Sequence, residues 1–387
     1  MHPYENIVVG GGIIGAAIAF ELGERGARVL LLDRQEPGRE ASWAAAGMLA
    51  PGPEYSAADA LVALGKASFE LYPEFVRRVE EKSGADVGFR RQPSIHLYFG
   101  ENAEQERESA AARFAAAGIR LEKISNAEAR RLEPHLTPLA SAAALSPDEG
   151  RVDNRTLTQA VLAAAARSGA EIRGGAGVKR LLINHERCAG VETATEKIPA
   201  PCVVVAAGAY CPQIEGLAEL APTRPIRGQM LALRPSEAAV WNVVRSERGY
   251  LVPREDGRLI AGSTLEDAGY EKRLTPAGLR EILDAVTELV PQLADAAVVE
   301  SWCGWRPDTP DHLPLIGPAD IAGLFVATGH FRNGILLAPA TAKYVAEWIV
   351  RGQASCELAA FNARRFLGRS VADGSPASPS RTSGAGQ

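Results

Sequence analysis

The sequence predicts an α/β protein of two domains, in which a domain with a parallel sheet covered by helices carries a second, β-rich domain inserted at two places. Three observations predict this fold. Short apolar runs alternate with helical stretches at the start of the chain, which is typical of βαβ units. Residues 225–302 are instead rich in strands. The first pattern then returns and continues to about residue 366, so the two patterns alternate along one chain.

The first 33 residues form one βαβ unit. The apolar run 6–9 predicts a strand, residues 16–25 predict a helix that ends before Gly26, and 28–33 predict a second strand. Both strands are continuously apolar, so we expect them to be parallel and buried on both faces.

The remaining elements follow from the same periodicities. We expect helices at 61–82, 102–117, 155–168, 276–289 and 335–350. We expect strands at 94–99, 170–173, 203–208, 229–233, 249–252, 259–262 and 324–327. The parallel-sheet domain is predicted to comprise 1–85, 147–222 and 305–368, and the inserted domain 86–146 and 223–304. Residues 369–387 are rich in Ser, Gly, Pro and Ala, which predicts a disordered tail.

Composition narrows the class of protein. A chain of 387 residues is long enough for two domains and a deep core. The net charge of −5, with no basic cluster, argues against a nucleic-acid partner. No apolar run approaches the roughly 20 residues that a membrane helix needs, and residues 1–6 lead into a strand without the cationic region of a signal peptide.

The five cysteines are odd in number, scattered, and form no C-x-x-C pair. This pattern argues against a disulfide framework or a zinc site, and it fits a reducing compartment. We therefore predict a cytoplasmic protein.

A G-x-G-x-x-G pattern at Gly10, Gly12 and Gly15 is the first functional signal. Alone it would be weak, since a glycine turn can simply pack a helix on a strand. Here it follows a strand, opens a helix, and precedes the acid Asp33 by about 20 residues, which is the context of a Rossmann-like dinucleotide site. Asp33 is expected to bind a ribose diol and to disfavour NADP.

The fingerprint does not distinguish NAD from FAD. A second fingerprint would indicate a flavoprotein reduced by NAD(P)H, and residues 175–180 begin like one. However, Arg180 stands where the third glycine belongs, so we interpret this segment as a turn. Two readings stay open, an NAD-dependent dehydrogenase and a flavoenzyme reduced directly by its substrate.

The turn 329–334 favours the flavin. It lies between the apolar strand 324–327 and a long helix, and it carries His330, Phe331, Arg332 and Asn333 between two glycines. A surface turn is the plainer interpretation. In an extended FAD, however, the ring lies far from the N-terminal turn and needs a second anchor. Backbone N–H groups and a helix N-terminus there would face the ring edge that becomes negative on reduction.

Six segments together resemble one family. They are residues 10–15, SWAAAGM at 42–48, PIRGQ at 225–229, GYLVPR at 249–254, WRPD at 305–308 with LPLIG at 313–317, and 329–334. The chain from about residue 6 to 366 resembles the D-amino-acid oxidase superfamily of FAD-dependent oxidoreductases, and specifically its glycine oxidase branch, which is linked to thiamine biosynthesis. The resemblance implies a Rossmann-like FAD-binding domain and an inserted substrate domain made of an antiparallel sheet and helices.

The activity implied by the resemblance is oxidative deamination of glycine, with sarcosine and small D-amino acids as further substrates. A hydride would pass from the substrate Cα to flavin N5, giving an imine or glyoxylate, ammonia and, with dioxygen, hydrogen peroxide. A D-amino-acid dehydrogenase that reduces a quinone, and a sarcosine oxidase-like enzyme, are alternatives within the superfamily. An NAD-binding dehydrogenase or regulatory protein is the alternative of another class. The resemblance further implies transfer of the imine to a thiazole-forming enzyme and is compatible with a homo-oligomer.

The resemblance also implies the substrate-binding residues. Arg306 would bind the substrate carboxylate, supplemented by Arg332, with Tyr250 as a hydroxyl donor and Met48 beside the substrate. A guanidinium fits a carboxylate bidentately, as a lysine would not. The plainer interpretations are a surface salt bridge from Arg306 to Asp308 or Asp311, and a half-buried strand aromatic for Tyr250.

We expect no acid or base catalyst, because His330 is better explained as holding the turn, and we find no metal-ligand cluster. The residues expected to contact FAD are Gly10, Gly12, Ile13, Ile14, Gly15, Asp33, Arg34, Ala41, Ser42, Ala46, Gly47, Met48, Val178, Ala207, Gly208, His330, Phe331, Arg332, Asn333, Gly334, Ile335 and Leu336. Cys303 lies in a segment that resembles the place where sarcosine oxidases attach their flavin covalently. An unreactive strand cysteine, with FAD bound non-covalently, is the favoured interpretation.

Overall fold

The computed structural model describes residues 3–53, 59–356 and 358–366. The predicted disordered tail, 369–387, lies outside the described residues. None of the described helices combines the length and apolar character needed to cross a bilayer.

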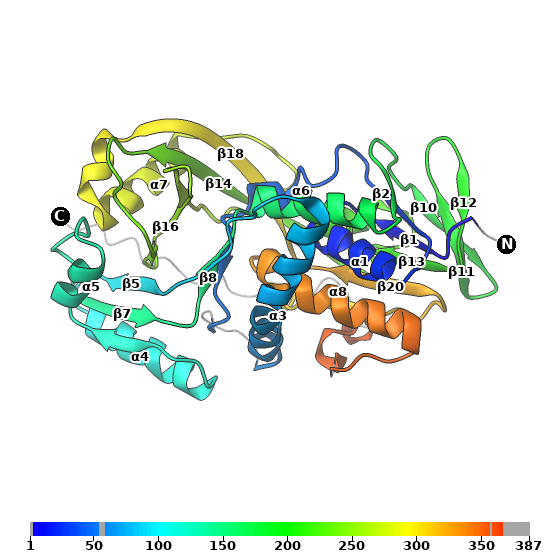
Figure 1. The fold of residues 1–387 in the computed structure, drawn as a ribbon, viewed down its shortest axis with the longest axis horizontal. Helices are drawn as coiled ribbons and strands as arrows, with labels where there is room; N and C mark the ends of the chain where they lie inside the picture. The colour runs from blue at the N-terminus through cyan, green and yellow to red at the C-terminus, as the bar shows by residue number, and fades with distance from the viewer. Residues whose placement is uncertain (1–2, 54–58, 357, 367–387) are drawn as a thin grey trace.

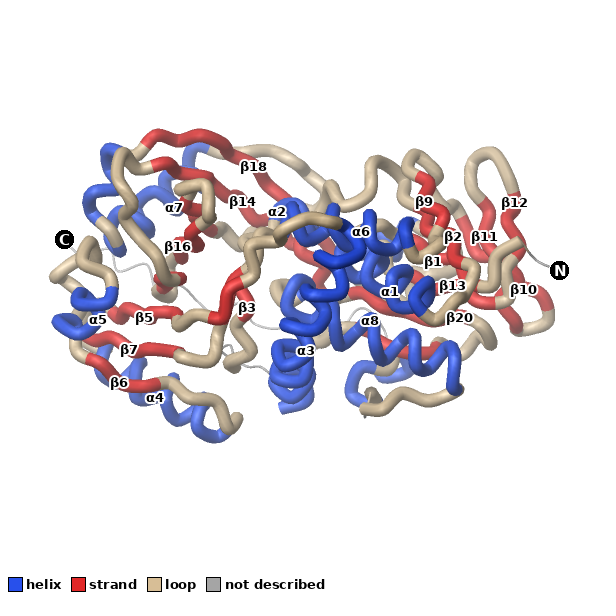
Figure 2. Tube along the Cα trace, viewed as in Figure 1, coloured by secondary structure: helices blue, strands red, loops and turns tan. Residues whose placement is uncertain are grey.

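A six-stranded sheet forms one end of the molecule (Figures 1 and 2). Its strand order is β19-β20-β13-β1-β2-β9. The bounds are β1 (Asn6–Val9), β2 (Val29–Leu32), β9 (Glu171–Arg173), β13 (Cys202–Val205), β19 (Leu315–Pro318) and β20 (Leu324–Thr328). All neighbouring pairs are parallel except β19 and β20. The predicted parallel, fully buried strands of the first βαβ unit are confirmed.

Four helices pack on this sheet or on one another. They are α1 (Ile13–Glu24), α3 (Asp59–Ser83), α6 (Asn154–Arg167) and α8 (Gly334–Arg351). Helix α1 contacts both α6 and α8, and α3 contacts the same two helices, as Figure 1 shows. Helix α1 begins at Ile13, three residues before the predicted start at 16, because Gly12 is its N-cap and the last residues of the glycine motif form its first turn.

An eight-stranded sheet forms the other end, in the order β18-β14-β17-β16-β15-β5-β7-β6 (Figure 2). The bounds are β5 (Ser94–Tyr98), β6 (Glu122–Ile124), β7 (Ala142–Ser146), β14 (Arg224–Arg234), β15 (Val243–Arg245), β16 (Tyr250–Pro253), β17 (Leu259–Gly262) and β18 (Ala297–Asp308). Strands β15 and β5 pair in parallel, so the sheet is mixed rather than purely antiparallel. Its helices are α4 (Ala103–Ala116), α5 (Asn126–Leu132) and α7 (Pro276–Leu289).

Short elements that the sequence analysis did not predict complete the fold. Strands β10 (Arg180–Asn184), β11 (Arg187–Glu192) and β12 (Lys197–Pro199) form a three-stranded sheet. The others are helix α2 (Ala41–Ala44), a sheet of β3 (Met48–Leu49), β8 (Gly150–Arg151) and β4 (Arg90–Arg91), and the 3-10 helices η1 (Gly208–Gln213), η2 (Pro291–Asp295), η3 (Ala359–Phe361) and η4 (Ala363–Phe366). In Figure 2, α2 and β3 lie between the two large sheets.

The two large sheets draw their strands from alternating parts of the chain, which is the arrangement that an inserted domain produces. The individual domain bounds stay predictions. The predicted bound between 304 and 305 falls inside β18, which pairs with β14 from Asp308 back to Ala297.

Candidate active site

A cavity of about 1210 Å³ is lined by residues of both large sheets. Pockets for drug-sized ligands are usually about 300–1,000 Å³, so this one has room for a dinucleotide together with a small substrate. Every predicted site residue lines it except Gly15 and Leu336. The structure therefore brings residues of all six family segments of the sequence to one cavity.

The glycine turn has the tight backbone that its motif predicts. Gly10 has a φ of +107°, and a Cβ there would lie 2.4 Å from the carbonyl oxygen of Ala206. A Cβ on Gly15 would lie 1.9 Å from the carbonyl oxygen of Gly10. Gly15 thus permits close contact between α1 and the turn, and for this reason it does not face the cavity.

The N-terminus of helix α1 lies at the cavity, where Gly12, Ile13 and Ile14 line it. Its N-cap, Gly12, provides no side-chain cap, and the Ile13 N–H donates to the buried Ser42 Oγ at 2.9 Å. The first N–H groups of a helix lack intrahelical acceptors, and the helix dipole is positive there, so such an end favours an anion such as a pyrophosphate.

Asp33 holds this turn from the end of β2. Its Oδ2 accepts a hydrogen bond from the Gly11 N–H at 2.7 Å, and its Oδ1 accepts one from the Gln35 N–H at 2.9 Å. Burial raises the pKa of this carboxyl, while the two backbone hydrogen bonds act in the opposite direction. The side chain lines the cavity, so the expected ribose contact is compatible with the geometry and stays a prediction.

The turn 329–334 is fixed from two sides. Gly329 has a φ of +73°, and Phe331, with a φ of +45°, donates its N–H to the carbonyl oxygen of Pro307 at 2.9 Å. His330 is buried, its Nε2 lies 3.0 Å from Thr341 Oγ1, and burial lowers its pKa to about 3. This is the environment of a neutral side chain that anchors the turn on α8, rather than of a general base.

Helix α8 presents a second open N-terminus to the same cavity. Its N-cap, Asn333, makes no side-chain cap hydrogen bond, and Gly334 and Ile335 line the cavity. Leu336 instead faces α3, whose Ser68 Oγ donates to the Leu336 carbonyl oxygen at 2.6 Å. Two open helix ends on one cavity fit FAD, because one can receive the pyrophosphate and the other the flavin edge that becomes negative on reduction.

Arg306 extends from β18 into the cavity. Its Nη2 donates to Ser263 Oγ at 2.6 Å and its Nη1 to the Thr264 carbonyl oxygen at 3.2 Å. The carboxylates of the alternative surface salt bridge have other partners. Asp308 binds Arg224 at 2.9 Å and His312 at 2.7 Å, and Asp311 binds Arg365 at 2.7 Å.

Two glycines that the sequence analysis did not single out make room for the predicted substrate residues. A Cβ on Gly228 would lie 2.3 Å from Arg306 Nη1. A Cβ on Gly262 would lie 2.7 Å from the Tyr250 hydroxyl and 2.6 Å from Met230 Sδ. The Tyr250 hydroxyl donates to Met230 Sδ at 3.4 Å, so a methionine also lies beside the predicted hydroxyl donor.

The cavity continues past Tyr250 into a region without any sequence motif. His96 on β5 and Arg245 on β15 line it, and Arg245 Nη2 lies 2.8 Å from both His96 Nε2 and the buried Glu149 Oε1. Further lining residues that the sequence analysis missed include Gly52, Phe114, Arg113, Tyr210, Arg248 and Gly304.

Cys303 does not line the cavity, although Gly304 and Arg306 do. Trp305 and Pro307 line it as well, so Cys303 directly precedes the part of β18 that borders the cavity. Burial raises the pKa of its thiol, which makes the nucleophilic thiolate scarcer. Among the described residues, no group of three or more His, Cys, Asp or Glu could hold a metal ion.

Comparison with known proteins agrees with this geometry. Residues 6–348 match the model of the DAO family, described as FAD-dependent oxidoreductases. A bifunctional ThiO/ThiG protein of Trichormus variabilis is 37% identical over 93% of this chain and 55% of its own length. The chain thus spans about half of that relative. A glycine oxidase of Geobacillus kaustophilus is 33% identical over 95% of this chain and 98% of its own length.

A solved structure extends the comparison. The crystal structure of glycine oxidase from Geobacillus kaustophilus matches with a TM-score of 0.90 and 32% identity, covering 95% of this chain and all of that one. The matched family sets aside the NAD-dependent alternative. This chain belongs to the DAO family of FAD-dependent oxidoreductases, and FAD is its cofactor.

Proposed function

We propose that this protein catalyses the oxidative deamination of glycine. The observation that carries the proposal is the placement of Arg306. Its side chain lies in the same cavity as the two open helix N-termini, and the missing side chain at Gly228 leaves room for its guanidinium. The similarity to glycine oxidases supports the choice of substrate. Sarcosine and small D-amino acids are proposed as further substrates.

The proposed mechanism assigns each side chain a binding task. Arg306 binds the substrate carboxylate with two parallel N–H groups, and Arg332 adds a second positive charge at the same cavity. The Tyr250 hydroxyl donates to the same carboxylate when it leaves Met230 Sδ. Bound FAD supplies the two-electron acceptor for the hydride from the substrate Cα.

Orientation accounts for most of the catalysis. A carboxylate held at one end and apolar walls such as Met48 and Met230 confine the amine to one geometry. The amine reacts in its neutral form, so no side chain needs to act as a strong base. The imine product is hydrolysed to glyoxylate and ammonia, and dioxygen accepts the electrons to give hydrogen peroxide.

Further proposals concern location and partners. The bifunctional ThiO/ThiG relatives support transfer of the imine to a thiazole-forming enzyme. The absence of cysteine pairs in the sequence supports a cytoplasmic protein. Cys303 is not among the residues that line the cavity, and burial raises the pKa of its thiol; both observations support non-covalent binding of FAD.

The test is a substrate panel on the purified yellow protein. Anaerobic glycine should bleach the flavin absorbance, and aerobic glycine should consume oxygen and release an equal amount of peroxide. Bleaching without oxygen consumption would instead indicate a dehydrogenase that reduces a quinone. If glycine, sarcosine and small D-amino acids all fail to bleach the flavin, the proposed substrate class is wrong.

A further inference from the structure

Residues 42–47, here called the cavity loop, comprise the last residues of helix α2 and the three residues that follow it, and four side chains bind their backbone. Ser42, Ala44, Ala45, Ala46 and Gly47 of this loop line the cavity. The side chains of Asn154, Arg155, Arg254 and Trp302 come from remote parts of the chain and bind the loop's carbonyl oxygens. The hydrogen bonds run from Asn154 Nδ2 to Ser42 O at 2.8 Å, from Arg155 Nε to Trp43 O at 3.2 Å, from Trp302 Nε1 to Ala44 O at 3.1 Å and from Arg254 Nη2 to Ala46 O at 2.8 Å.

This arrangement fixes the direction of the loop's N–H groups. In a trans peptide the C=O and N–H bonds point in opposite directions, so binding of the Ala46 carbonyl directs the Gly47 N–H away from Arg254. Gly47 is buried with a φ of +76°, and a Cβ there would lie 2.1 Å from the Val152 carbonyl oxygen. Within the described part of the chain, its N–H has no hydrogen-bond acceptor. A buried, unpaired backbone donor is costly, which is a sign that a ligand completes it.

Arg254 binds both the cavity loop and Asn154, a second side chain that binds this loop. It follows β16, is buried, and donates from Nη2 both to Ala46 O and to Asn154 Oδ1 at 2.8 Å. Its own Nη1 is buried without a partner among the described residues. Burial lowers its pKa to about 10, so it stays charged at neutral pH. A buried cation with an unsatisfied donor destabilises the fold, so packing alone does not explain an arginine here.

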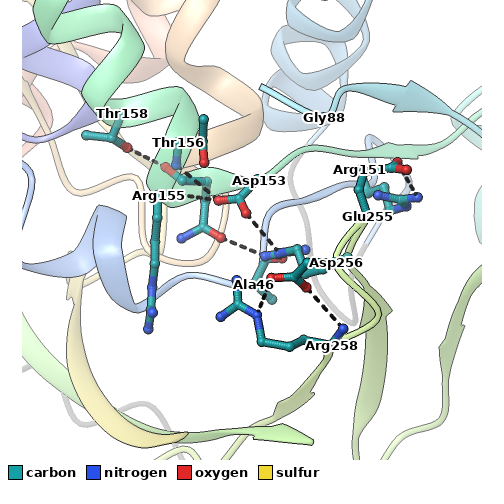
Figure 3. Close-up of polar contacts among 12 residues, drawn as sticks. Ala46, Gly88, Arg151, Asp153, Arg155, Thr156, Thr158, Glu255, Asp256 and Arg258 are labelled. Carbon is teal, nitrogen blue, oxygen red and sulfur yellow. Dashed lines mark hydrogen bonds and ion pairs between the residues drawn. The ribbon is translucent and has the colours of Figure 1, made fainter. Parts of the chain in front are cut away.

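The surrounding charges are arranged so that Arg254 remains available to the loop. Figure 3 shows Arg151 beside Glu255 and Arg258 beside Asp256. Arg155, also drawn there, binds Glu300 at 2.8 Å. Asp153 Oδ2 lies 3.7 Å from Arg254 Nε. The neighbouring arginines each have their own carboxylate, whereas Arg254 combines one distant carboxylate with a carbonyl of the cavity loop.

We propose that Arg254 is a positioning residue for the flavin. By binding Ala46 O and Asn154 together, it presents the Gly47 N–H to the flavin ring and thereby sets the ring's reduction potential. A fixed donor stabilises the reduced ring, which carries more negative charge, more than it stabilises the oxidised ring. The proposal rests on the FAD cofactor and the proposed function, but its measurements need no amine substrate.

The test compares variants of the holoenzyme. In Arg254→Met, we expect FAD to bind about tenfold more weakly, the flavin absorption bands to shift, and the reduction potential to fall. A tenfold loss in the preference for the reduced flavin corresponds to about 30 mV for two electrons. Arg254→Lys should restore part of the potential, since one ammonium can reach one of the two acceptors. Arg258→Met is the matched control, because Arg258 belongs to the same group of arginines and binds Asp256 instead of the loop.

Trp302→Phe is a second, milder variant. It removes the N–H that binds Ala44 O and keeps an aromatic ring, so a smaller shift of the potential in the same direction is expected. If Arg254→Met does not fold, this variant decides alone. A potential and spectrum equal to those of the wild type in both variants would overturn the proposal, as would an equal shift in Arg258→Met. Failure to oxidise glycine with the flavin shifts intact would instead overturn the proposed function only, whereas a chain that binds no FAD would overturn both.

Discussion

Gly228 lies directly against the guanidinium of Arg306, so that a Cβ on Gly228 would come within 2.3 Å of Arg306 Nη1 and 2.6 Å of its Cζ. The two residues lie on neighbouring strands, two positions apart in the β14–β18 register, where Gly228 pairs with Gly304. The absence of a side chain at 228 thus determines where the cation lies.

This contact gives the first prediction. Gly228→Ala should displace the end of the flexible Arg306 side chain with little effect on folding. Losing one of the charged hydrogen bonds to the carboxylate, worth about 1.5–3 kcal/mol, should raise the apparent KM for glycine by about 10- to 100-fold. Steady-state kinetics with Gly65→Ala as control measures it, since a Cβ at Gly65 makes only ordinary contacts. An unchanged KM would mean that Arg306 does not bind the carboxylate from this position.

The second prediction separates binding from folding at Arg306. Arg306→Lys keeps the charge but loses the bidentate geometry, so the specificity constant for glycine should fall by about 100-fold while FAD stays bound. Oxidation of a small amine without a carboxylate, such as ethylamine, should be affected far less. Equal losses for the two substrates would assign Arg306 a structural role.

The third prediction concerns the glycine turn. Gly12→Val should yield colourless protein, because the added side chain enters the cavity beside Ser42 Oγ, 3.2 Å from the position of a Cβ. The ratio of flavin to protein absorbance measures the loss. A fully yellow variant would show that the pyrophosphate does not lie against this turn.

The fourth prediction concerns Cys303. Acid precipitation of the purified protein should release all the flavin into the supernatant, and Cys303→Ala should behave identically, because Cys303 is not among the residues that line the cavity. Flavin that remains in the wild-type pellet but not in that of Cys303→Ala would establish a covalent link.

The fifth prediction concerns pH and His330. Its pKa is about 3 in the folded protein and about 6.5 in the unfolded chain, so the unfolded chain binds the proton first. The stability it contributes is therefore complete above pH 6.5 and is lost as the pH falls toward 3, by about 1.4 kcal/mol per pH unit. Between pH 7 and pH 5, denaturant unfolding of the wild type should lose about 2 kcal/mol more than that of His330→Gln. Equal losses of unfolding free energy in the two proteins would show that the pKa of His330 is not lowered in the folded protein.

Local signals explain what could be predicted from the sequence. In the first βαβ unit, the glycine spacing and the apolar runs depend only on residues that are close in the sequence, so strands β1 and β2 were predicted correctly. Helix α7 was predicted with its observed bounds, 276–289, because Thr275 caps it, Pro276 opens it and apolar residues recur at helical spacing. Nearly all the site residues predicted from the family motifs line one cavity.

Contacts between distant residues explain what could not be predicted. Arg254 binds a backbone carbonyl 208 positions away, and a carbonyl leaves no trace in the residue type at Ala46. His96 and Arg245 are neighbours only because β5 and β15 pair in parallel, which no local pattern indicates. The hairpin of β10 and β11 was missed because Leu181, Leu182 and Ile183 are all apolar although Ile183 is exposed, so the residue types of β10 do not alternate with burial.

The order of strands in the six-stranded sheet also constrains how the protein is made on the ribosome. Strand β13 is complete at residue 205, but its neighbour β20 is not synthesised until residues 324–328. Until then, one apolar edge of the sheet lacks its partner, the kind of exposed edge that chaperones protect and that otherwise aggregates. The glycine turn at 10–15 is synthesised before the strands of the inserted sheet and the turn at 329–334 after them, so the complete FAD site forms only once residue 334 has been added.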